Sequence, residues 1–274
     1  HPGGGGLNVA RAIAKLGGTA RAIWTSGGHV GQLLSDLLDE EQIEHHPLPV
    51  AAMTRENLIV FENQSGQQFR FGMPGAKLSP QERQHCLDHV AGLDPAPDYL
   101  VLSGSLPPGV EDGFYAEVAR AAPASTRVLL DTSGKALQEG VRGGVFLVKP
   151  NIAELEQFCG HDINHEGDVS TVARQLIDAG HTQAVVTSLG SGGAILVTAD
   201  DFFRVRAPVV HIRSKVGAGD SMVAGIVLAL HRGESLPTAV RYGDDRRHGT
   251  LPPPGRRTTV PGNQRLTGAR RPLQ

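Results

Sequence analysis

Apolar and polar residues in the first quarter of the chain follow two different periods. Apolar positions recur every three to four residues over 7–16 and 30–38, which predicts two amphipathic helices with a short strand at 20–24 between them. The segments 57–62 and 67–71 are instead strand-like and are separated by a short polar turn. The first quarter of the chain is therefore predicted to form a helix, a strand, a second helix and then a β-hairpin.

From residue 79 onward, apolar strands alternate with helical stretches. Ser79-Pro80-Gln81-Glu82 has the form of a capping box with proline at the first helical position. Strands are predicted at 99–103, 127–131, 145–149 and 183–188, with helices near 113–122, 151–158 and 169–179. Apolar strands that alternate with helices indicate an α/β fold, with a mostly parallel sheet covered by helices on both faces.

The carboxyl ends of these four strands carry polar residues and glycines. They read SGSLPPG at 103–109, DTSG at 131–134, KPN at 149–151 with Glu154 three residues later, and SLGSGG at 188–193. One such end is often only a turn. Four in succession favour a binding site, because ligands of parallel sheets lie at the carboxyl ends of the strands.

A glycine-rich turn at 216–219 precedes an almost wholly apolar helix at about 220–230. Glycine allows a close approach of the backbone, and the N–H groups of a helix start attract anions. A carboxylate here, Asp220, would repel an anion, so its presence suggests a specific function. One such function is general base for a hydroxyl that attacks a phosphoryl group. The alternative is a simple helix cap, and this motif alone does not separate the two.

Composition narrows the class of protein. The chain has 274 residues, 39% hydrophobic and 20% charged, with a formal net charge of -2. These values suit one α/β domain with a small appendage and give no reason to expect a nucleic-acid partner. No apolar run is long enough to cross a membrane, and the chain shows no basic segment followed by an apolar one, so neither a membrane span nor a secretory signal is expected. Cys86 and Cys159 form no C-x-x-C pair, so a reducing, cytoplasmic location is expected.

Seven segments carry a resemblance to a known family. They are GGGGLNVARAIAKLGG near the start, TRENL at 54–58, the four strand-end motifs above in the forms SGSLPPG, DTSG, KPNIAELE and TSLGSGGA, and VGAGDSM at 216–222. In this order the set resembles the PfkB family of carbohydrate kinases, and most closely its minor 6-phosphofructokinase branch. The resemblance implies a ribokinase-like fold over residues 1–243, with a small β lid that includes a hairpin at about 44–75.

The resemblance also implies roles for individual residues. Asp220 would be the general base, beside an anion hole formed by Gly217, Ala218 and Gly219. The sugar-phosphate side of the site would comprise Gly4, Gly5, Asn8, Arg55, Ser105 and Asp131. Within this set, the guanidinium of Arg55 would contact the phosphate already on the sugar.

A second set of residues would serve ATP and its ions. It comprises Lys149, Asn151, Glu154, Ser188, Gly190 and Gly193. Glu154 would bind Mg²⁺ through water, although Asn151 and Glu154 also make a good helix-cap pair. Ser214 and Val216 would form a site for a monovalent cation such as K⁺, but Lys215 stands where many relatives carry threonine.

The implied reaction is ATP-dependent phosphorylation of a sugar phosphate, with fructose 6-phosphate giving fructose 1,6-bisphosphate. A 1-phosphofructokinase and a tagatose-6-phosphate kinase remain open alternatives, as does a catalytically inactive fragment of such an enzyme. In the family the lid pairs with a second lid, so the expected partners are a sugar phosphate, ATP and a second copy of the chain. No membrane partner is expected.

The two ends depart from the family pattern. The sequence begins inside the first motif, so we expect the family's first strand, with a sugar-binding aspartate and a lysine, to be missing. Residues 244–274 hold seven arginines, five prolines and two acidic residues without periodicity. Such a segment is expected to be disordered and outside the family pattern. It lacks the interleaved aromatic residues of a nucleic-acid-binding segment.

Overall fold

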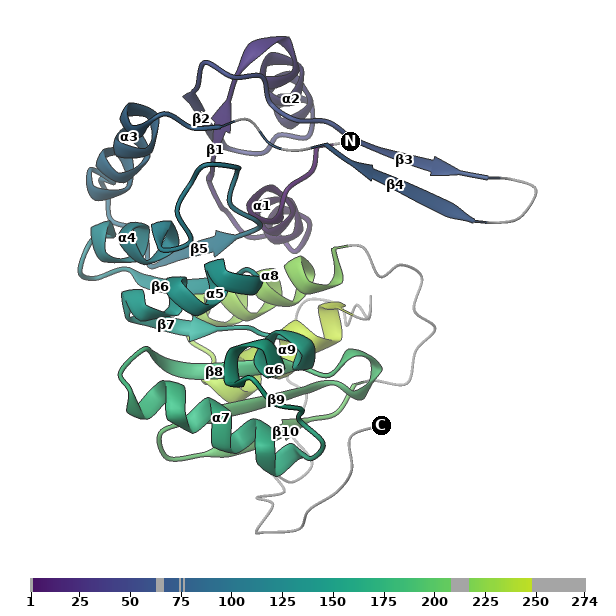
Figure 1. The fold of residues 1–274 in the computed structure, drawn as a ribbon, viewed down its shortest axis with the longest axis vertical. Helices are drawn as coiled ribbons and strands as arrows, with labels where there is room; N and C mark the ends of the chain where they lie inside the picture. The colour runs from purple at the N-terminus through teal and green to yellow at the C-terminus, as the bar shows by residue number, and fades with distance from the viewer. Residues whose placement is uncertain (1, 63–66, 74, 76, 208–216, 248–274) are drawn as a thin grey trace.

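The structure is a computed structural model that describes residues 2–62, 67–73, 75, 77–207 and 217–247. Figure 1 shows helices packed against a sheet in the larger part of the molecule, and two smaller pairs of strands at its N-terminal end. The predicted α/β class is therefore confirmed.

The large sheet has six strands in the order β10-β9-β8-β7-β6-β5. They are β5 (Tyr99–Ser103), β6 (Arg127–Asp131), β7 (Val145–Val148), β8 (Thr182–Ser188), β9 (Ala194–Thr198) and β10 (Phe202–Val205). Strands β5 to β8 are parallel, as predicted, whereas β9 and β10 continue the sheet in antiparallel fashion. The last two strands were not predicted from the sequence.

Helices cover both faces of this sheet because successive strand residues point to opposite sides. Leu130 belongs to the core beneath one group of helices and Leu129 to the core beneath the other, and both are at most 1% exposed. The first group is α3 (Pro80–Ala91), α4 (Phe114–Ala121), α5 (Gly134–Gly140), α6 (Ile152–Cys159) and α7 (Glu166–Asp178). The second group is α1 (Gly5–Lys15), α8 (Ala218–His231) and α9 (Leu236–Arg247).

The N-terminal part contains a separate two-stranded sheet. Strands β1 (Ala22–Ser26) and β2 (His45–Pro49) are parallel and are joined through α2 (Gly28–Glu40). Leu38 of α2 is fully buried in a small core with residues of α1 and β1. Within the expected lid range of about 44–75, β2 pairs with β1 and not with the hairpin, and the bounds of the lid stay a prediction.

The predicted hairpin consists of β3 (Asn57–Phe61) and β4 (Gln68–Gly72), which pair in antiparallel register. We call these two strands the ribbon. Figure 1 shows the ribbon extending away from the rest of the molecule. Its side chains Leu58 and Phe71 lie opposite each other and are 58% and 52% exposed.

The C-terminal helix α9 runs past the expected end of the family domain. It continues to Arg247, four residues beyond position 243, and Asp244 is fully buried. This helix packs closely on α8, where a Cβ on Gly225 would lie 2.8 Å from the Cα of Gly243. The remainder of the expected tail, residues 248–274, lies outside the described residues. Within the described ranges, no helix is long and apolar enough to cross a membrane.

Candidate active site

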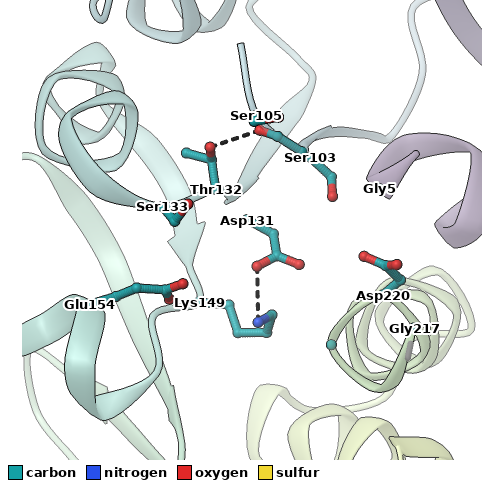
Figure 2. Close-up of a pocket in the computed structure, with 12 residues that line it drawn as sticks. Gly5, Ser103, Ser105, Asp131, Thr132, Ser133, Lys149, Glu154, Gly217 and Asp220 are labelled. Atoms are coloured by element: carbon teal, nitrogen blue, oxygen red, sulfur yellow. Dashed lines mark hydrogen bonds and ion pairs between the residues drawn. The ribbon is translucent and has the colours of Figure 1, made fainter. Parts of the chain in front are cut away.

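The carboxyl ends of the parallel strands meet at one edge of the sheet, as expected. Ser103 at the end of β5 is in register with Asp131 at the end of β6, and Lys149 follows β7 directly. These residues line a cavity of about 300 Å³ together with the first turn of α8. The lining residues are Gly5, Ser103, Gly104, Ser105, Asp131, Thr132, Ser133, Lys149, Glu154, Gly217, Gly219 and Asp220. Figure 2 shows the side chains of Asp131, Lys149 and Asp220 around this space.

A buried ion pair lies at the base of the cavity. The ammonium Nζ of Lys149 is 2.9 Å from Oδ1 of Asp131, and the two side chains are 7% and 15% exposed. Asp131 thereby fixes the lysine head group between two strand ends (Figure 2). A Cβ on Gly219 would lie 3.6 Å from the same Nζ, so the lysine also approaches the start of α8.

Asp220 stands in the first turn of α8, the largely buried helix that the sequence predicted. Gly217 precedes the helix in the left-handed conformation with φ 74°, which favours glycine. Oδ2 of Asp220 accepts a hydrogen bond of 2.8 Å from Nδ2 of Asn8. Burial raises the pKa of Asp220 and nearby Asp131 raises it further, while the Asn8 bond and the charge of Lys149 lower it. A carboxylate with a raised pKa is suited to accept a proton.

Glu154 caps a helix and also lines the cavity, while its role toward Mg²⁺ stays a prediction. It forms a capping box at the start of α6, in which Asn151 Oδ1 accepts from the Glu154 N–H at 2.9 Å and Glu154 Oε2 accepts from the Asn151 N–H at 2.8 Å. It also lines the cavity. Burial raises the pKa of Glu154, an effect that the Asn151 N–H and the charge of Lys149 oppose.

Sequence reasoning did not assign a role to four of the lining residues. These residues are Ser103, Gly104, Thr132 and Ser133. They belong to the motifs SGSLPPG and DTSG, so their positions at strand ends could have identified them as site residues. The turn after β5 is held by two hydroxyl groups. Thr132 Oγ1 donates to the Gly104 carbonyl at 2.7 Å and Tyr115 donates to the same oxygen at 3.0 Å.

Gly5 and Arg55 reach this turn from the N-terminal part of the chain. A Cβ on Gly5 would contact Ser103 Oγ and lie 2.9 Å from the Gly104 N atom, so the two backbones pack directly. The Nη2 atom of Arg55 donates to Ser105 Oγ at 3.4 Å. The structure therefore brings three expected sugar-side residues, Gly5, Arg55 and Ser105, to one side of the cavity.

Several expected site residues do not line the cavity. Among them, Asn151 and Ser188 form a parallel bridge that joins the ends of β7 and β8. Gly193 is buried, and backbone atoms of residues 205–207 occupy the space beside its Cα. Gly4, Gly190 and Ala218 also do not line it, whereas Ser214 and Val216, expected at a monovalent cation, lie outside the described residues.

Comparisons with known proteins give relatives with named activities. The chain is 42% identical over 93% of its length to an ATP-dependent 6-phosphofructokinase isozyme 2 of Mycobacterium tuberculosis strain H37Rv, of which it covers 75%. It is 38% identical over 83% of its length to a 1-phosphofructokinase of Xanthomonas campestris, of which it covers 73%.

Solved structures show the same fold. The crystal structure of Escherichia coli phosphofructokinase-2 in complex with fructose-6-phosphate superimposes with a TM-score of 0.85 at 39% identity, and the match covers 91% of this chain and 82% of that one. The same enzyme has been solved in a tetrameric inhibited form and with potassium. These matches confirm the ribokinase-like fold expected from the sequence.

The sequence model of the pfkB carbohydrate kinases matches residues 1–245, which is most of the chain. This range includes every strand end and the glycine turn of the cavity described above. The chain therefore belongs to the pfkB family of carbohydrate kinases.

Proposed function

We propose that this chain phosphorylates fructose 6-phosphate with ATP to give fructose 1,6-bisphosphate and ADP. The observation that carries the proposal is the position of Asp220, which is partly buried at the start of α8, bonded to Asn8, and faces the cavity opposite the Asp131–Lys149 pair. Its raised pKa and its place beside a helix N-terminus suit a proton acceptor next to a phosphoryl group.

In the proposed step, a hydroxyl oxygen of the sugar attacks the γ-phosphorus of ATP. The hydroxyl proton passes to the carboxylate of Asp220, a new O–P bond forms, and the bond from the γ-phosphorus to the β,γ-bridging oxygen breaks to release ADP. The first N–H groups of α8 have no acceptor within the helix and point toward the developing negative charge. The ammonium of Lys149 lies near the same turn and adds positive charge there.

The described residues fit Mg²⁺ as an ion held largely by water and phosphate. They contain no group of three histidine, cysteine or acidic side chains arranged around one metal position. Glu154 contributes one cavity-lining carboxylate, which would hold the hydrated ion. Magnesium would supply charge neutralisation on the phosphates of ATP.

The preference for a sugar phosphate rests on Arg55. Its guanidinium lies at the rim of the cavity beside Ser105, where it can bind a phosphate group on the sugar through two N–H groups. Relatives named as 6-phosphofructokinase and 1-phosphofructokinase both support a phosphorylated acceptor. Fructose 6-phosphate is proposed for two reasons. The more similar of these relatives is named a 6-phosphofructokinase, and the E. coli structure was solved in complex with fructose-6-phosphate.

The proposal is tested by a coupled assay of ADP release with fructose 6-phosphate, fructose 1-phosphate and tagatose 6-phosphate. We expect the highest kcat/KM with fructose 6-phosphate. The variant Asp220→Asn should lower kcat by about a hundredfold to ten-thousandfold, the range of a general base.

The matched control is Asp168→Asn, which changes an aspartate in the capping box of α7 that does not line the cavity. It should leave kcat within about twofold. Turnover that survives Asp220→Asn, or a folded chain without turnover on any of the three substrates, would contradict the proposal. A preference for fructose 1-phosphate would instead assign the 1-phosphofructokinase reaction.

We also propose that two chains associate through the ribbon. Leu58 and Val60 of β3 lie opposite Phe71 and Phe69 of β4, so the four side chains share one face, and each is at least 40% exposed. The tetrameric inhibited form of the E. coli relative supports self-association, and the exposed apolar face is the reason to propose the ribbon as the contact. Sedimentation velocity should show a dimer that Leu58→Lys dissociates, whereas Leu33→Lys, at a residue 52% exposed on α2, should not. A monomeric parent chain would exclude this assembly.

Potassium dependence is the remaining part of the proposal. It rests on the potassium complex of the E. coli relative. Turnover should be higher in K⁺ than in tetramethylammonium at equal ionic strength, and equal rates would contradict a functional cation site.

A further inference from the structure

One carboxylate holds both chain segments that connect the ribbon to the rest of the molecule. Glu82 lies in the first turn of α3. Its Oε2 accepts from the N–H of Ser79 at 2.6 Å, and its Oε1 accepts from the N–H of Ala51 at 2.6 Å. Ala51 lies on the segment that leads into β3, and Ser79 lies on the segment that follows β4.

Helix capping explains only one of these two bonds. In a capping box, the third helical residue accepts from the N-cap N–H while the N-cap hydroxyl accepts in return. Ser79 and Glu82 meet this description, with Ser79 Oγ accepting from the Glu82 N–H at 3.2 Å. The bond to Ala51, 31 residues away, adds nothing to the cap. It ties α3 to the segment that enters the ribbon.

The entry segment is held at three points before it reaches the cavity. The N–H of Val50 donates to Ser26 O at 2.9 Å, and the N–H of Thr54 donates to Gly27 O at 2.9 Å. The bond from Ala51 to Glu82 lies between them. Arg55 follows Thr54 directly and contacts Ser105 at the rim of the cavity. The position of the Arg55 backbone is therefore set by this anchored segment.

The exit segment lies against the loop that follows β5. A Cβ on Gly75 would lie 3.3 Å from Pro108, in the loop that continues the turn after β5. Leu78 is 8% exposed and precedes Ser79, where Glu82 holds the chain. Both connections of the ribbon thus bond to Glu82 and also contact the loop after β5, which carries Ser105.

We infer that Glu82 is a positioning residue for this side of the site: by joining the entry and exit segments it holds Arg55 in place beside Ser105. The inference rests on the proposed function, in which Arg55 binds the phosphate of the acceptor sugar. The N–H groups of Ser79 and Ala51 lower the pKa of Glu82, as expected for a carboxylate that accepts two hydrogen bonds in its ionised form.

The kinetic test compares Glu82→Gln with Ser79→Ala. The glutamine keeps one acceptor oxygen but presents an NH₂ donor where the second oxygen was, so one of the two N–H groups loses its partner. Ser79→Ala removes the hydroxyl of the cap and leaves both bonds to Glu82 in place. It is therefore a matched control for helix capping alone.

We expect Glu82→Gln to raise KM for fructose 6-phosphate by about tenfold, because a displaced Arg55 weakens its charge-assisted hydrogen bond to the sugar phosphate. KM for ATP and kcat should change by less than about twofold, because the nucleotide side and Asp220 are untouched. Ser79→Ala should leave all three parameters near those of the parent. Equal effects of both variants on KM would reduce Glu82 to a helix cap and overturn the inference.

Hydrogen exchange supplies a readout that does not depend on turnover. In Glu82→Gln, a peptide covering residues 48–56 should exchange faster than in the parent and in Ser79→Ala, while α7 stays unchanged. This result would support the bridge even in a chain without kinase activity, so failure of the proposed function is distinguishable from failure of the inference. Unchanged exchange at 48–56 in Glu82→Gln would overturn it.

Discussion

Asn8 donates a hydrogen bond of 2.8 Å to Asp220, and so joins two helices whose residues are 212 positions apart. The bond stabilises the ionised form of a carboxylate whose burial favours the protonated form. Asn8 thus does more than pack α1 against α8. It lowers the pKa of the group that we propose as the base.

Asn8→Ala should therefore raise the pKa of Asp220. The acid limb of the pH profile of kcat/KM should move to higher pH, because a proton must leave Asp220 before it can act as base. Asn164→Ala, at an exposed site before α7, serves as control and should leave the limb in place. An unchanged or downward-shifted limb in Asn8→Ala would show that the bond does not tune Asp220.

Local sequence patterns were sufficient for the parallel half of the fold and insufficient for its extensions. Strands β5 to β8 are separated by recognisable helix signals, including the capping boxes at Ser79 and Asn151. Strand β9 is buried on both faces over four residues and shows no alternation. Helix α9 has few apolar residues, and its place depends on the approach of Gly243 to α8, which no local pattern encodes.

The same distinction applies to the site. Residues inside ordered motifs, such as Asp131, Lys149 and Asp220, were predicted and do line one cavity. The contact of Tyr115 with Gly104 had no signal in the sequence, because it depends on how α4 packs beneath the turn. The roles of Ser188, Gly190 and Gly193 toward a nucleotide stay predictions.

The buried pair of Asp131 and Lys149 predicts strong coupling between two substitutions. Lys149→Met leaves a carboxylate without its cation in a poorly solvated place and should lower the free energy of unfolding by about 3 to 5 kcal/mol. Asp131→Asn combined with Lys149→Met should cost less than the sum of the single changes, since neither charge remains. Urea denaturation of the four proteins measures this, and additive losses would show that the pair is not coupled.

The first two residues of α1 predict opposite effects for the same substitution. Gly5→Ala would press a methyl group into Ser103 and the Gly104 backbone, and should cost about 1 to 3 kcal/mol of stability. Gly6→Ala meets nothing within 4 Å and should be neutral or stabilising by up to about 1 kcal/mol. Thermal or urea unfolding of both variants checks the contrast. A destabilised Gly6→Ala would point to a requirement for backbone freedom rather than for space.

Tyr115 and Thr132 share one acceptor, the carbonyl oxygen of Gly104, so each should partly replace the other. Tyr115→Phe and Thr132→Val should each cost about 1 kcal/mol, and the double variant should cost more than their sum because the carbonyl then loses both donors. Burial raises the pKa of Tyr115 to about 12, so its hydroxyl remains a donor throughout the neutral range. A double variant whose loss equals the sum would show that the two donors act independently.

Asp220→Asn should remove activity without lowering stability. Burial raises the pKa of Asp220 above its ordinary value of 3.8, so the folded state binds this proton more readily than the unfolded state. The resulting cost to stability is absent below that value, grows as pH rises toward the folded-state pKa, and is fully present at neutral pH. Asparagine cannot ionise and retains an acceptor for Asn8. Urea midpoints should therefore place Asp220→Asn at or above the parent near pH 7, with a smaller difference near pH 4. A variant less stable than the parent near pH 7 would mean that Lys149 and Asn8 stabilise the charge by more than burial costs.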